Sequence, residues 1–323
     1  MLAGSQPWSD RFVDGALIVS PTSPGQSILD LSREHVIEAF ERYGTLLFRG
    51  FELDPVAELS RYTDRYTEKY AYDLVERQSR FEQKMVRNVS LGNYAIDLHS
   101  EASYAAVWPE IIWFYCNAPP TSEGATTLCD GLMLWKKLPA ALQKLFLRCP
   151  LKYEFSLPVP ITSRAEAGSM EWPFPTPGIS GQYDKAARVF HLSVVRFAVH
   201  ESRLRKVNAM VDLPAFVNYL LLSGVHKKGH NVIKGVSFVD GTPITSTMME
   251  EIAGIAEPLI LDVDWRPRDL VMIDNRRYMH GRRFYPAGDP RDIVQVQTAR
   301  ASFPFGATTR KQTAPVPSTT SVS

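Results

Sequence analysis

Residues 269–297, DLVMIDNRRYMHGRRFYPAGDPRDIVQVQ, contain the clearest signal of the fold. The apolar run at 270–273 and the mostly apolar segment IVQV at 293–296 flank a middle that is rich in Arg, Tyr, Pro, Gly and Asp. Short apolar runs bounded by turn residues are typical of β-strands. The run LILDVDW at 259–265 precedes this stretch, and the last strand continues towards Phe303. The final third of the chain is therefore predicted to be strand after strand.

The rest of the chain indicates the same fold class. IIWFYC at 111–116 is the clearest apolar run, and helical patterns occur at 33–43, between Ser32 and Gly44, and at 131–147. Strands and helices do not alternate in the regular strand–helix–strand order of a parallel α/β sheet. The sequence therefore predicts a mainly β protein with peripheral α-helices, whose core is a β-barrel or a sandwich.

The domain organisation is predicted from composition. A single domain is expected over residues 1–305. Within it, residues 157–183 contain five Pro and fit no period, which predicts an irregular lid or insert. The tail at 306–323 is rich in Thr, Ser and Pro and has no aromatic residue, so it is predicted to be disordered.

The charge balance argues against nucleic acid and membrane surfaces as partners. The 323 residues include 36 Lys and Arg against 35 Asp and Glu, a formal net charge of +1. Basic clusters at 203–206 and 227–228 are not interleaved with aromatic residues, so we interpret them as solvated faces. A small molecule is the expected partner, and a homo-oligomer is left open.

The cysteines and the N-terminus indicate a reducing compartment. Cys116, Cys129 and Cys149 cannot all pair with one another, and their spacing matches neither a zinc site nor a disulfide framework. The first ten residues, MLAGSQPWSD, lack the features of a signal peptide, and no apolar stretch reaches the roughly 18 residues that a membrane span needs. We therefore expect a cytoplasmic protein without membrane contact.

A candidate metal site lies in AIDLHSEASY at 95–104. His99 and Glu101 are two residues apart, so on a strand both side chains project from one face and one metal can bind both. Such a pair is common on strand surfaces. What favours a site is that residues 269–297 supply His280, with Arg291 eleven residues later. The other five histidines are interpreted as core, pocket or surface residues.

Taken together, these segments resemble the taurine dioxygenase family of Fe(II)/2-oxoglutarate-dependent oxygenases, including its clavaminate-synthase-like relatives. The matching pieces occur in the family's order between residues 45 and 303. They are His99-Ser100-Glu101, the GATTLCDG segment that begins at Gly124, the strand that ends in Asp274-Asn275, His280-Gly281-Arg282, and Arg291.

The resemblance implies a double-stranded β-helix (jelly-roll) core and a facial triad of His99, Glu101 and His280 that holds Fe(II). It implies that 2-oxoglutarate and dioxygen occupy the remaining positions on the metal. An unactivated C–H bond of a small molecule would be hydroxylated or desaturated while 2-oxoglutarate is converted to succinate and CO2. Arg291 matches the guanidinium that binds the far carboxylate of 2-oxoglutarate, a bidentate task for which Arg is suited. Thr126 matches a hydroxyl that helps to bind 2-oxoglutarate in the family, and Thr127 is the second candidate for this role.

Further site residues are predicted around these groups. Asp274 and Asn275 are candidates for orienting the ligating histidines, with turn formation as an equal alternative. Asn93, Tyr94 and Tyr104 flank the first ligand pair and are candidate substrate contacts. For the two tyrosines, packing inside the barrel is the alternative.

Two departures from the family pattern narrow the chemistry. Glu101 stands where many members have Asp, but in the clavaminate-synthase-like branch the longer Glu side chain also binds the metal. Halogenating relatives have a small residue at this position, so halogenation is excluded. Gln295, four residues past Arg291, stands where the taurine enzymes have a second arginine for the sulfonate. Gln295 is therefore a candidate substrate contact, facing an uncharged or differently charged group of the substrate. Taurine is therefore not expected, and an amino acid derivative or a specialised metabolite fits the branch best.

Two other functions remain open at this point. A Zn-dependent hydrolase can use the same three ligands, and a non-catalytic small-molecule binding module can keep the same fold. Arg291 and Thr126 argue against the hydrolase, because it needs no clamp for a keto acid, and the intact ligand set argues against the binding module. The substrate, the regiochemistry and the choice between hydroxylation, desaturation and cyclisation are not specified by the sequence.

Overall fold

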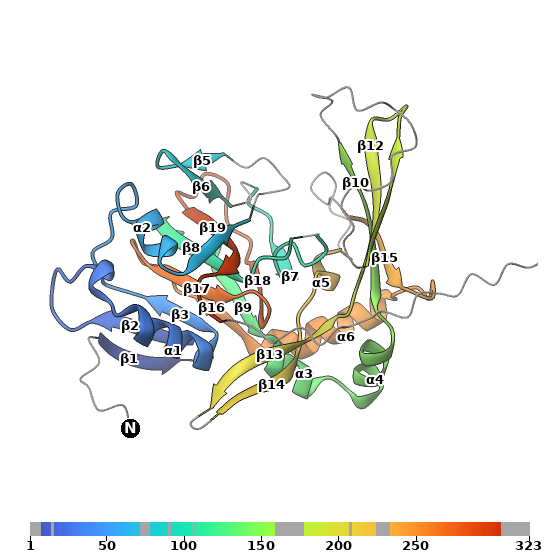
Figure 1. Ribbon diagram of the computed structural model, residues 1–323, viewed down its shortest axis with the longest axis horizontal. Coiled ribbons are helices and arrows are strands. Elements are labelled where there is room, and N and C mark those ends of the chain that lie inside the picture. Colours follow the sequence, from blue (N-terminus) through green and yellow to red (C-terminus); the bar gives the residue numbers. More distant parts are fainter. Residues whose placement is uncertain are drawn as a thin grey trace, which may run out of the picture.

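A computed structural model describes residues 8–13, 16–71, 78–89, 92–105, 107–158, 178–206, 209–223 and 233–304. Within these ranges the chain is mainly β, with helices at the periphery, as predicted (Figure 1). The tail at 306–323 lies outside the described residues.

The larger sheet joins segments that are far apart in the sequence. Its pairings are antiparallel except for that between β2 and β3. In spatial order its strands are β1 (Trp8–Val13), β2 (Ala16–Pro21), β3 (Thr45–Phe48), β17 (Leu270–Asp274), β8 (Ile111–Ala118), β19 (Asp292–Ala301), β6 (Gln83–Asn88) and β5 (Ser79–Arg80), and β4 (Thr67–Tyr70) pairs with β19. The quoted stretch 269–297 therefore supplies two strands, β17 and β19, on either side of β8.

A smaller antiparallel sheet faces the larger one and carries the candidate metal ligands. Its strands in order are β16 (Ile260–Val263), β9 (Thr126–Asp130), β18 (Tyr278–Arg282) and β7 (Ile96–His99). Apolar side chains from both sheets meet in one buried cluster: Leu47, Ile112, Phe114, Cys116, Val271, Ile273 and Ile293 from the larger sheet, and Leu128, Val263, Trp265 and Tyr278 from the smaller sheet or its margin. Two facing sheets of this kind form the jelly roll, so the predicted fold class is confirmed.

Strand β17 shows why its apolar run is continuous. Val271 and Ile273 point into the cluster between the sheets, whereas Leu270 and Met272 point into a second cluster on the outer face of the larger sheet. A strand that is buried on both faces has no reason to alternate with polar residues. The outer cluster is covered by η1 (Ile28–Asp30), α1 (Arg33–Tyr43) and α2 (Leu59–Asp64).

Local signals fix the helix ends. Ser32 caps α1 by accepting a hydrogen bond from the His35 N–H (3.4 Å). Gly44 ends the helix with φ of 74°, and a Cβ at this position would lie 2.8 Å from Cε2 of Tyr278, so glycine is required twice over. The helix predicted over 131–147 is in fact two, α3 (Gly131–Lys137) and α4 (Ala140–Arg148), because the residue before Pro139 is kept out of the helical conformation.

An arm projects from the jelly roll (Figure 1). Its sheet has the order β11 (Ile179–Asp184), β12 (Val189–Arg196), β10 (Leu151–Pro158) and β15 (Ile233–Phe238), and β13 (Val199–Lys206) and β14 (Ala209–Phe216) form a separate hairpin. The prediction that 157–183 is irregular throughout is wrong at both ends, since residues 157–158 extend β10 and 179–183 belong to β11. Cross-strand pairing with β12 overrides the Pro and Gly content there. Residues 159–177 lie outside the described residues.

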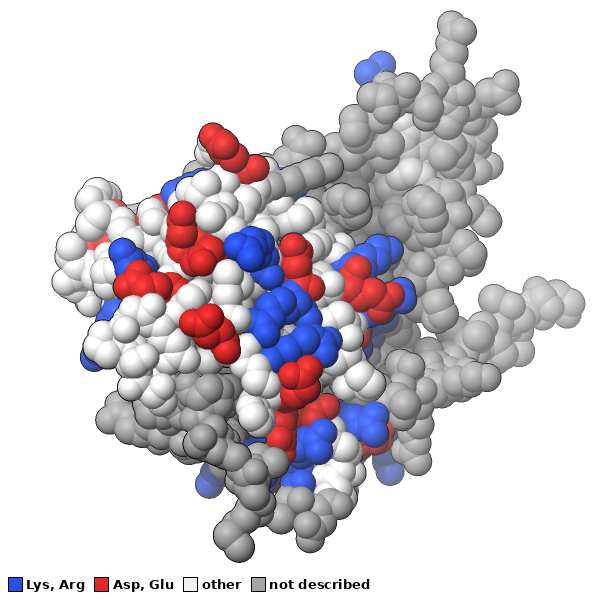
Figure 2. All heavy atoms as spheres, turned by 60° about the vertical axis from the view of Figure 1, so that its left-hand side comes forward, with Lys and Arg blue, Asp and Glu red and all other residues white. Residues whose placement is uncertain are grey.

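The remaining helices pack between the arm and the smaller sheet. They are α3, α4, α5 (Leu220–Ser223), α6 (Ser246–Ala256) and η2 (Glu257–Leu259), and α3 to α6 contribute side chains to a third buried cluster together with the arm. None of the helices in the described ranges is long and apolar enough to cross a membrane. All three cysteines are free thiols. Acidic and basic side chains are interspersed over the face shown in Figure 2.

Candidate metal centre

The pairing of β7 with β18 brings the two candidate histidine ligands together. His99 ends β7 and lies directly opposite His280 of β18 in the antiparallel register, with ring centroids 4.5 Å apart. Glu101 follows two residues later, after β7 has ended. The register of two strands, one from each half of the chain, therefore builds the site.

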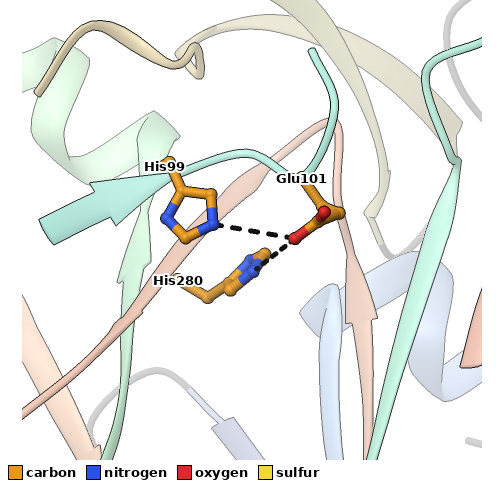
Figure 3. A group of neighbouring side chains, drawn as sticks. All are labelled: His99, Glu101 and His280. Atoms are coloured by element: carbon orange, nitrogen blue, oxygen red, sulfur yellow. Dashed lines mark ion pairs between the residues drawn. The ribbon is translucent and has the colours of Figure 1, made fainter. Parts of the chain in front are cut away.

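The three side chains converge (Figure 3). An Oε2 atom of Glu101 lies 3.7 Å from Nε2 of His99 and 3.7 Å from Nε2 of His280, and the candidate ligand atoms all lie within 4.8 Å of one another. Nδ1 of His99 lies 2.9 Å from the Asp97 carbonyl oxygen, which can only accept, so in the neutral ring Nδ1 carries the proton and Nε2 keeps its lone pair. Two imidazoles and one carboxylate in a facial arrangement are ligands that suit non-haem Fe(II).

Aromatic rings pack against both imidazoles. Phe114 contacts the ring of His280 at a centroid distance of 5.2 Å, and Tyr219 contacts that of His99 at 5.2 Å. Both histidines are buried, at 7% and 4% exposed. The rings therefore have little freedom to rotate, and water reaches them from few directions.

Behind the ligands, Asn275 holds the main chain at Glu101. Its Nδ2 donates to the Glu101 carbonyl (3.0 Å) and the Pro109 carbonyl (2.9 Å), and its Oδ1 accepts from the Glu101 N–H (2.9 Å). Ser100 Oγ donates to the Asn275 carbonyl (2.7 Å) and accepts from Nε1 of Trp108 (2.8 Å). Asn275 was a candidate either for orienting the histidines or for turn formation, and the hydrogen bonds described here hold the loop that carries Glu101.

Asp274 is the last residue of β17, and its carboxylate bonds to the main chain of the turn that follows the strand. Its Oδ1 accepts from the Arg276 N–H (2.8 Å), which is the turn geometry considered as the alternative for this residue. Burial raises the pKa of this carboxyl to about 7, against the hydrogen bond from Arg276 and the charge of Arg277, which lower it.

Arg291 lies beside Thr126, as the resemblance predicts. Its Nε donates to the Gly124 carbonyl (2.7 Å) and a terminal nitrogen lies 3.3 Å from Thr126 Oγ1. Burial, and then the nearby charge of Arg282, lower the pKa of this guanidinium to about 10. The lowered pKa indicates a cation whose desolvation outweighs the favourable effect of the nearby Asp289 charge.

Two neighbouring carboxylates, Asp289 and Asp292, could have formed ion pairs with Arg291, but neither does in the described part of the chain. Asp292 instead binds Arg80 through two hydrogen bonds of 2.6 and 2.8 Å. Asp289 accepts from the main-chain N–H of Arg291 (2.9 Å) and not from its guanidinium. Within the described residues, the Arg291 guanidinium therefore forms no ion pair with either carboxylate.

Thr127 is not brought to Arg291. On β9 it pairs with Gly281, and its Oγ1 is 2.7 Å from where a Cβ of that glycine would lie. Thr126 and Leu128 project from the opposite face of the strand, with Leu128 in the cluster between the sheets. Both threonines are buried, but of the two candidate hydroxyls only that of Thr126 lies on the face of β9 that is turned towards the larger sheet.

The predicted substrate contacts have distinct surroundings. Gln295 of β19 is 2% exposed, shares its strand face with Ile293 of the intersheet cluster, and has an Nε2 without a hydrogen-bond partner among the described residues. Tyr104 contacts the ring of Tyr219 at 4.6 Å and that of Phe155 at 5.4 Å, and Tyr219 in turn contacts the ring of His99 at 5.2 Å.

Asn93 and Tyr94 lie near the two arginines instead. Asn93 lines a cavity of about 410 Å³ together with Tyr285 and Arg291. The Tyr94 carbonyl accepts from Arg282 (2.8 Å), whose guanidinium also lies 5.5 Å from the Tyr94 ring centroid. Both residues therefore border the Arg291 side of the site.

Several site residues were missed at the level of sequence. Tyr285 lies between two cations, its ring centroid 5.0 Å from Arg282 and 5.5 Å from Arg291. Trp265 donates from Nε1 to Thr126 Oγ1 (3.1 Å). Tyr219 and Phe114, on the imidazoles, complete the set. No spacing rule marks these aromatics, because each comes to the site from a different element.

Comparisons with known proteins agree with this geometry. The family model described as "Taurine catabolism dioxygenase TauD, TfdA family" matches residues 14–297. A clavaminate synthase-like protein of Arabidopsis thaliana is 24% identical over 315 residues, which cover 86% of this chain and 91% of that protein.

Solved structures show the same fold. PvcB of Pseudomonas aeruginosa superposes with a TM-score of 0.57 at 17% identity, covering 91% of this chain and 92% of its own. AAD-2, solved in complex with Mn(II) and N-oxalylglycine, superposes with a TM-score of 0.56 at 16% identity, covering 93% and 99%. A taurine dioxygenase from Burkholderia xenovorans gives 0.55 at 14% identity, covering 90% and 87%.

Proposed function

We propose that this chain, which belongs to the taurine catabolism dioxygenase TauD, TfdA family, holds iron(II) with His99, Glu101 and His280 and oxidises a small molecule other than taurine. Its family makes it a non-haem iron(II), 2-oxoglutarate-dependent dioxygenase. The observation that carries the residue roles is the convergence of three ligand atoms within 4.8 Å in a fold that also buries Arg291 without a carboxylate partner among the described residues.

The protein's own groups prepare the metal site. Iron(II), when bound, supplies the open coordination positions and the redox chemistry by which dioxygen oxidises 2-oxoglutarate and then a C–H bond. His99 keeps its Nδ1 proton on the Asp97 carbonyl, so Nε2 is available as a ligand. Asn275 fixes the main chain of Glu101, so little conformational entropy is lost when the carboxylate binds.

Arg291 is proposed to bind the far carboxylate of 2-oxoglutarate. A guanidinium has five N–H donors, and the described contacts use one on Gly124 and one on Thr126. The remaining donors suit a charge-assisted bond to a carboxylate, which also brings a negative charge to the guanidinium. Thr126 is proposed to assist, and Thr127 is not, because its hydroxyl faces away.

The substrate is proposed to place a hydrogen-bond acceptor against Gln295. This buried amide nitrogen has no partner in the described residues, and leaving such a donor unpaired costs about 1–3 kcal/mol. Because Gln295 is uncharged, it cannot form an ion pair with a sulfonate, and this supports a substrate other than taurine. The aromatic rings of Tyr219 and Tyr104 favour a partly apolar molecule, such as an amino acid derivative or a specialised metabolite, that is hydroxylated or desaturated.

Zinc hydrolysis on the same ligands is disfavoured. A hydrolase has no use for a desolvated arginine that is held ready by Gly124 and Thr126. A cytoplasmic location remains a prediction from the composition and the free cysteines.

The test is an anaerobic titration of the apoprotein with Fe(II) and then with 2-oxoglutarate, following the visible charge-transfer band of a chelated keto acid. Wild type should show the band, and Arg291→Ala should need about 100-fold more 2-oxoglutarate to reach it, consistent with loss of a buried charge-assisted bond. The control is Arg205→Ala, which removes an arginine paired with Glu41 away from the site. Absence of the band with metal bound would contradict the proposal.

A further inference from the structure

We propose that Trp265 is a positioning residue that sets the direction of the Thr126 hydroxyl proton and thereby makes the co-substrate pocket selective for a carboxylate. The proposal rests on the proposed function, in which Thr126 and Arg291 bind the far end of 2-oxoglutarate. It concerns a residue that neither the family resemblance nor the sequence pattern singles out.

The hydrogen-bond chemistry at Thr126 leaves one arrangement. A threonine hydroxyl has one proton to donate and two lone pairs that accept. Indole Nε1 of Trp265 lies 3.1 Å from Thr126 Oγ1, and a terminal nitrogen of Arg291 lies 3.3 Å from it. Indole and guanidinium nitrogens can only donate. Thr126 therefore accepts from both, its two lone pairs are occupied, and its proton must point elsewhere.

That proton has no acceptor within the part of the chain that the structure describes. The contacts of Thr126 Oγ1 are the two bonds that it accepts. Thr126 is 4% exposed, so bulk water is not a ready substitute. A buried donor without an acceptor is costly, and a ligand that brings an acceptor removes that cost.

The indole is held firmly enough to fix this direction. Trp265 is 5% exposed and packs in the apolar cluster between the two sheets. It follows β16, whose Val263 pairs with Thr126 itself, so the strand register sets the distance from indole to hydroxyl. The hydroxyl is thus oriented before any ligand arrives, and binding need not order it.

The end of the co-substrate pocket at Thr126 and Arg291 therefore offers hydrogen-bond donors to a ligand. The Thr126 hydroxyl and the unused N–H groups of Arg291 all donate, so a carboxylate, which only accepts, satisfies them together. A terminal amide would turn its own N–H groups towards these donors. We therefore expect the co-substrate to be a keto acid with a second carboxylate, discriminated from the corresponding amide in part through Trp265.

The experiment uses Trp265→Phe, which removes the N–H and keeps an aromatic ring. Dissociation constants for 2-oxoglutarate and for its 5-amide, 2-oxoglutaramate, are measured on the Fe(II)-loaded protein without oxygen by the charge-transfer band. They are also measured on the Mn(II)-loaded protein by calorimetry. The variant should bind 2-oxoglutarate about 10-fold more weakly, as expected for one buried hydrogen bond, and the amide almost unchanged.

The matched control is Trp113→Phe. Trp113 is also buried and also donates from Nε1 to a threonine, Thr298 (3.2 Å), but in the cluster on the outer face of the larger sheet. It should lose comparable thermal stability while both dissociation constants stay at the wild-type values. In a Thr126→Val background, Trp265→Phe should add less than 2-fold.

The possible results distinguish a failure of the Trp265 role from a failure of the proposed function. If Arg291→Ala weakens 2-oxoglutarate binding but Trp265→Phe does not, or if the preference over the amide is unchanged, the role of Trp265 is overturned and the proposed function stands. If both tryptophan variants weaken binding equally, the effect is general loss of packing and the inference fails. If Arg291→Ala binds normally, the proposed function itself fails.

Discussion

His280 lies directly across from His99 in the antiparallel pairing of β18 with β7, and the two imidazole rings are 4.5 Å apart. Because the side-chain period of a strand is two, a slip of one residue in this pairing would turn one imidazole to the opposite face. The metal site and the strand register are therefore one structural feature.

Removal of a ligand should abolish metal binding and turnover together. Glu101→Ala deletes the carboxylate that lies 3.7 Å from both Nε2 atoms, and two neutral imidazoles alone bind Fe(II) weakly. Fe(II) binding by calorimetry should fall at least 100-fold, and uncoupled succinate formation should be lost. His191→Ala, at an exposed histidine of the arm, is the control, and retained activity in Glu101→Ala would sink the assignment.

Asn275→Ala should weaken metal binding without touching a ligand. The substitution leaves the Glu101 N–H, the Glu101 carbonyl and the Pro109 carbonyl without their partner. We expect a 10- to 100-fold loss of Fe(II) affinity, as for other residues that orient ligands, and a loss of thermal stability in the apoprotein. Destabilisation with unchanged iron affinity would show that Asn275 supports the fold only.

Gly124→Ala should impair 2-oxoglutarate binding. A Cβ there would lie 2.8 Å from Cβ of Tyr285 and 3.2 Å from Cδ of Arg291, and φ is +98°. Gly241→Ala is the control, because its φ is +86° but nothing lies within 4 Å, so it has the backbone strain without the steric clash. The 2-oxoglutarate dissociation constant should rise at least 10-fold in the first variant only; equal behaviour would assign the effect to strain.

Asp274→Asn should change the pH dependence of stability. Burial raises the folded-state pKa of Asp274 to about 7 from an ordinary value of 3.8, so its contribution to stability is fully present below about pH 4 and is lost as pH rises through 7. Asn cannot ionise and still accepts from the Arg276 N–H. The variant should gain on the order of 2 kcal/mol relative to wild type between pH 5 and pH 8.

Urea denaturation at several pH values measures this difference. Asp240→Asn serves as the control, because hydrogen bonds from Thr242 lower the pKa of that exposed carboxyl. Between pH 5 and pH 8 its difference from wild type should stay constant, because this carboxyl is ionised in both the folded and the unfolded protein there. A flat difference for Asp274→Asn would mean that Asp274 is ionised in the folded protein throughout this range.

Gln295→Leu should stabilise the protein and damage catalysis. The amide nitrogen is buried without a partner among the described residues, so an apolar side chain of similar size removes an unpaired donor. The midpoint of thermal unfolding should rise by a few degrees, 2-oxoglutarate binding should be unchanged, and coupling of succinate formation to substrate oxidation should fall. A lower midpoint would show that the amide already has a partner.

Part of the site could be predicted from the residues alone. The two-residue spacing of His99 and Glu101 and the strand that delivers His280 are local features, and the structure brings the three together. The same period of two implies that Thr126 and Thr127 face opposite sides, but not which of them faces the larger sheet. The pairing of Thr127 with Gly281 decides that.

Other parts could not be predicted because they depend on elements that meet only in the folded chain. Trp265 reaches Thr126 from the end of β16, Tyr219 reaches His99 from beyond β14, and Asn275 reaches Glu101 across 174 residues. The irregular appearance of 157–183 misled at its ends for the same reason, since pairing with β12 outweighs local propensity.

The mainly β fold class, the order of the ligand-bearing segments and the chemical types of the candidate metal and co-substrate groups could all be predicted from the amino-acid sequence. These follow from residue type and from period along the chain. Only the tertiary structure decided which hydroxyl faces Arg291, which aromatic rings enclose the imidazoles and which amide holds Glu101. The physical reason is that a strand period fixes alternation but not register, and register is set by how two sheets bury their apolar faces against each other.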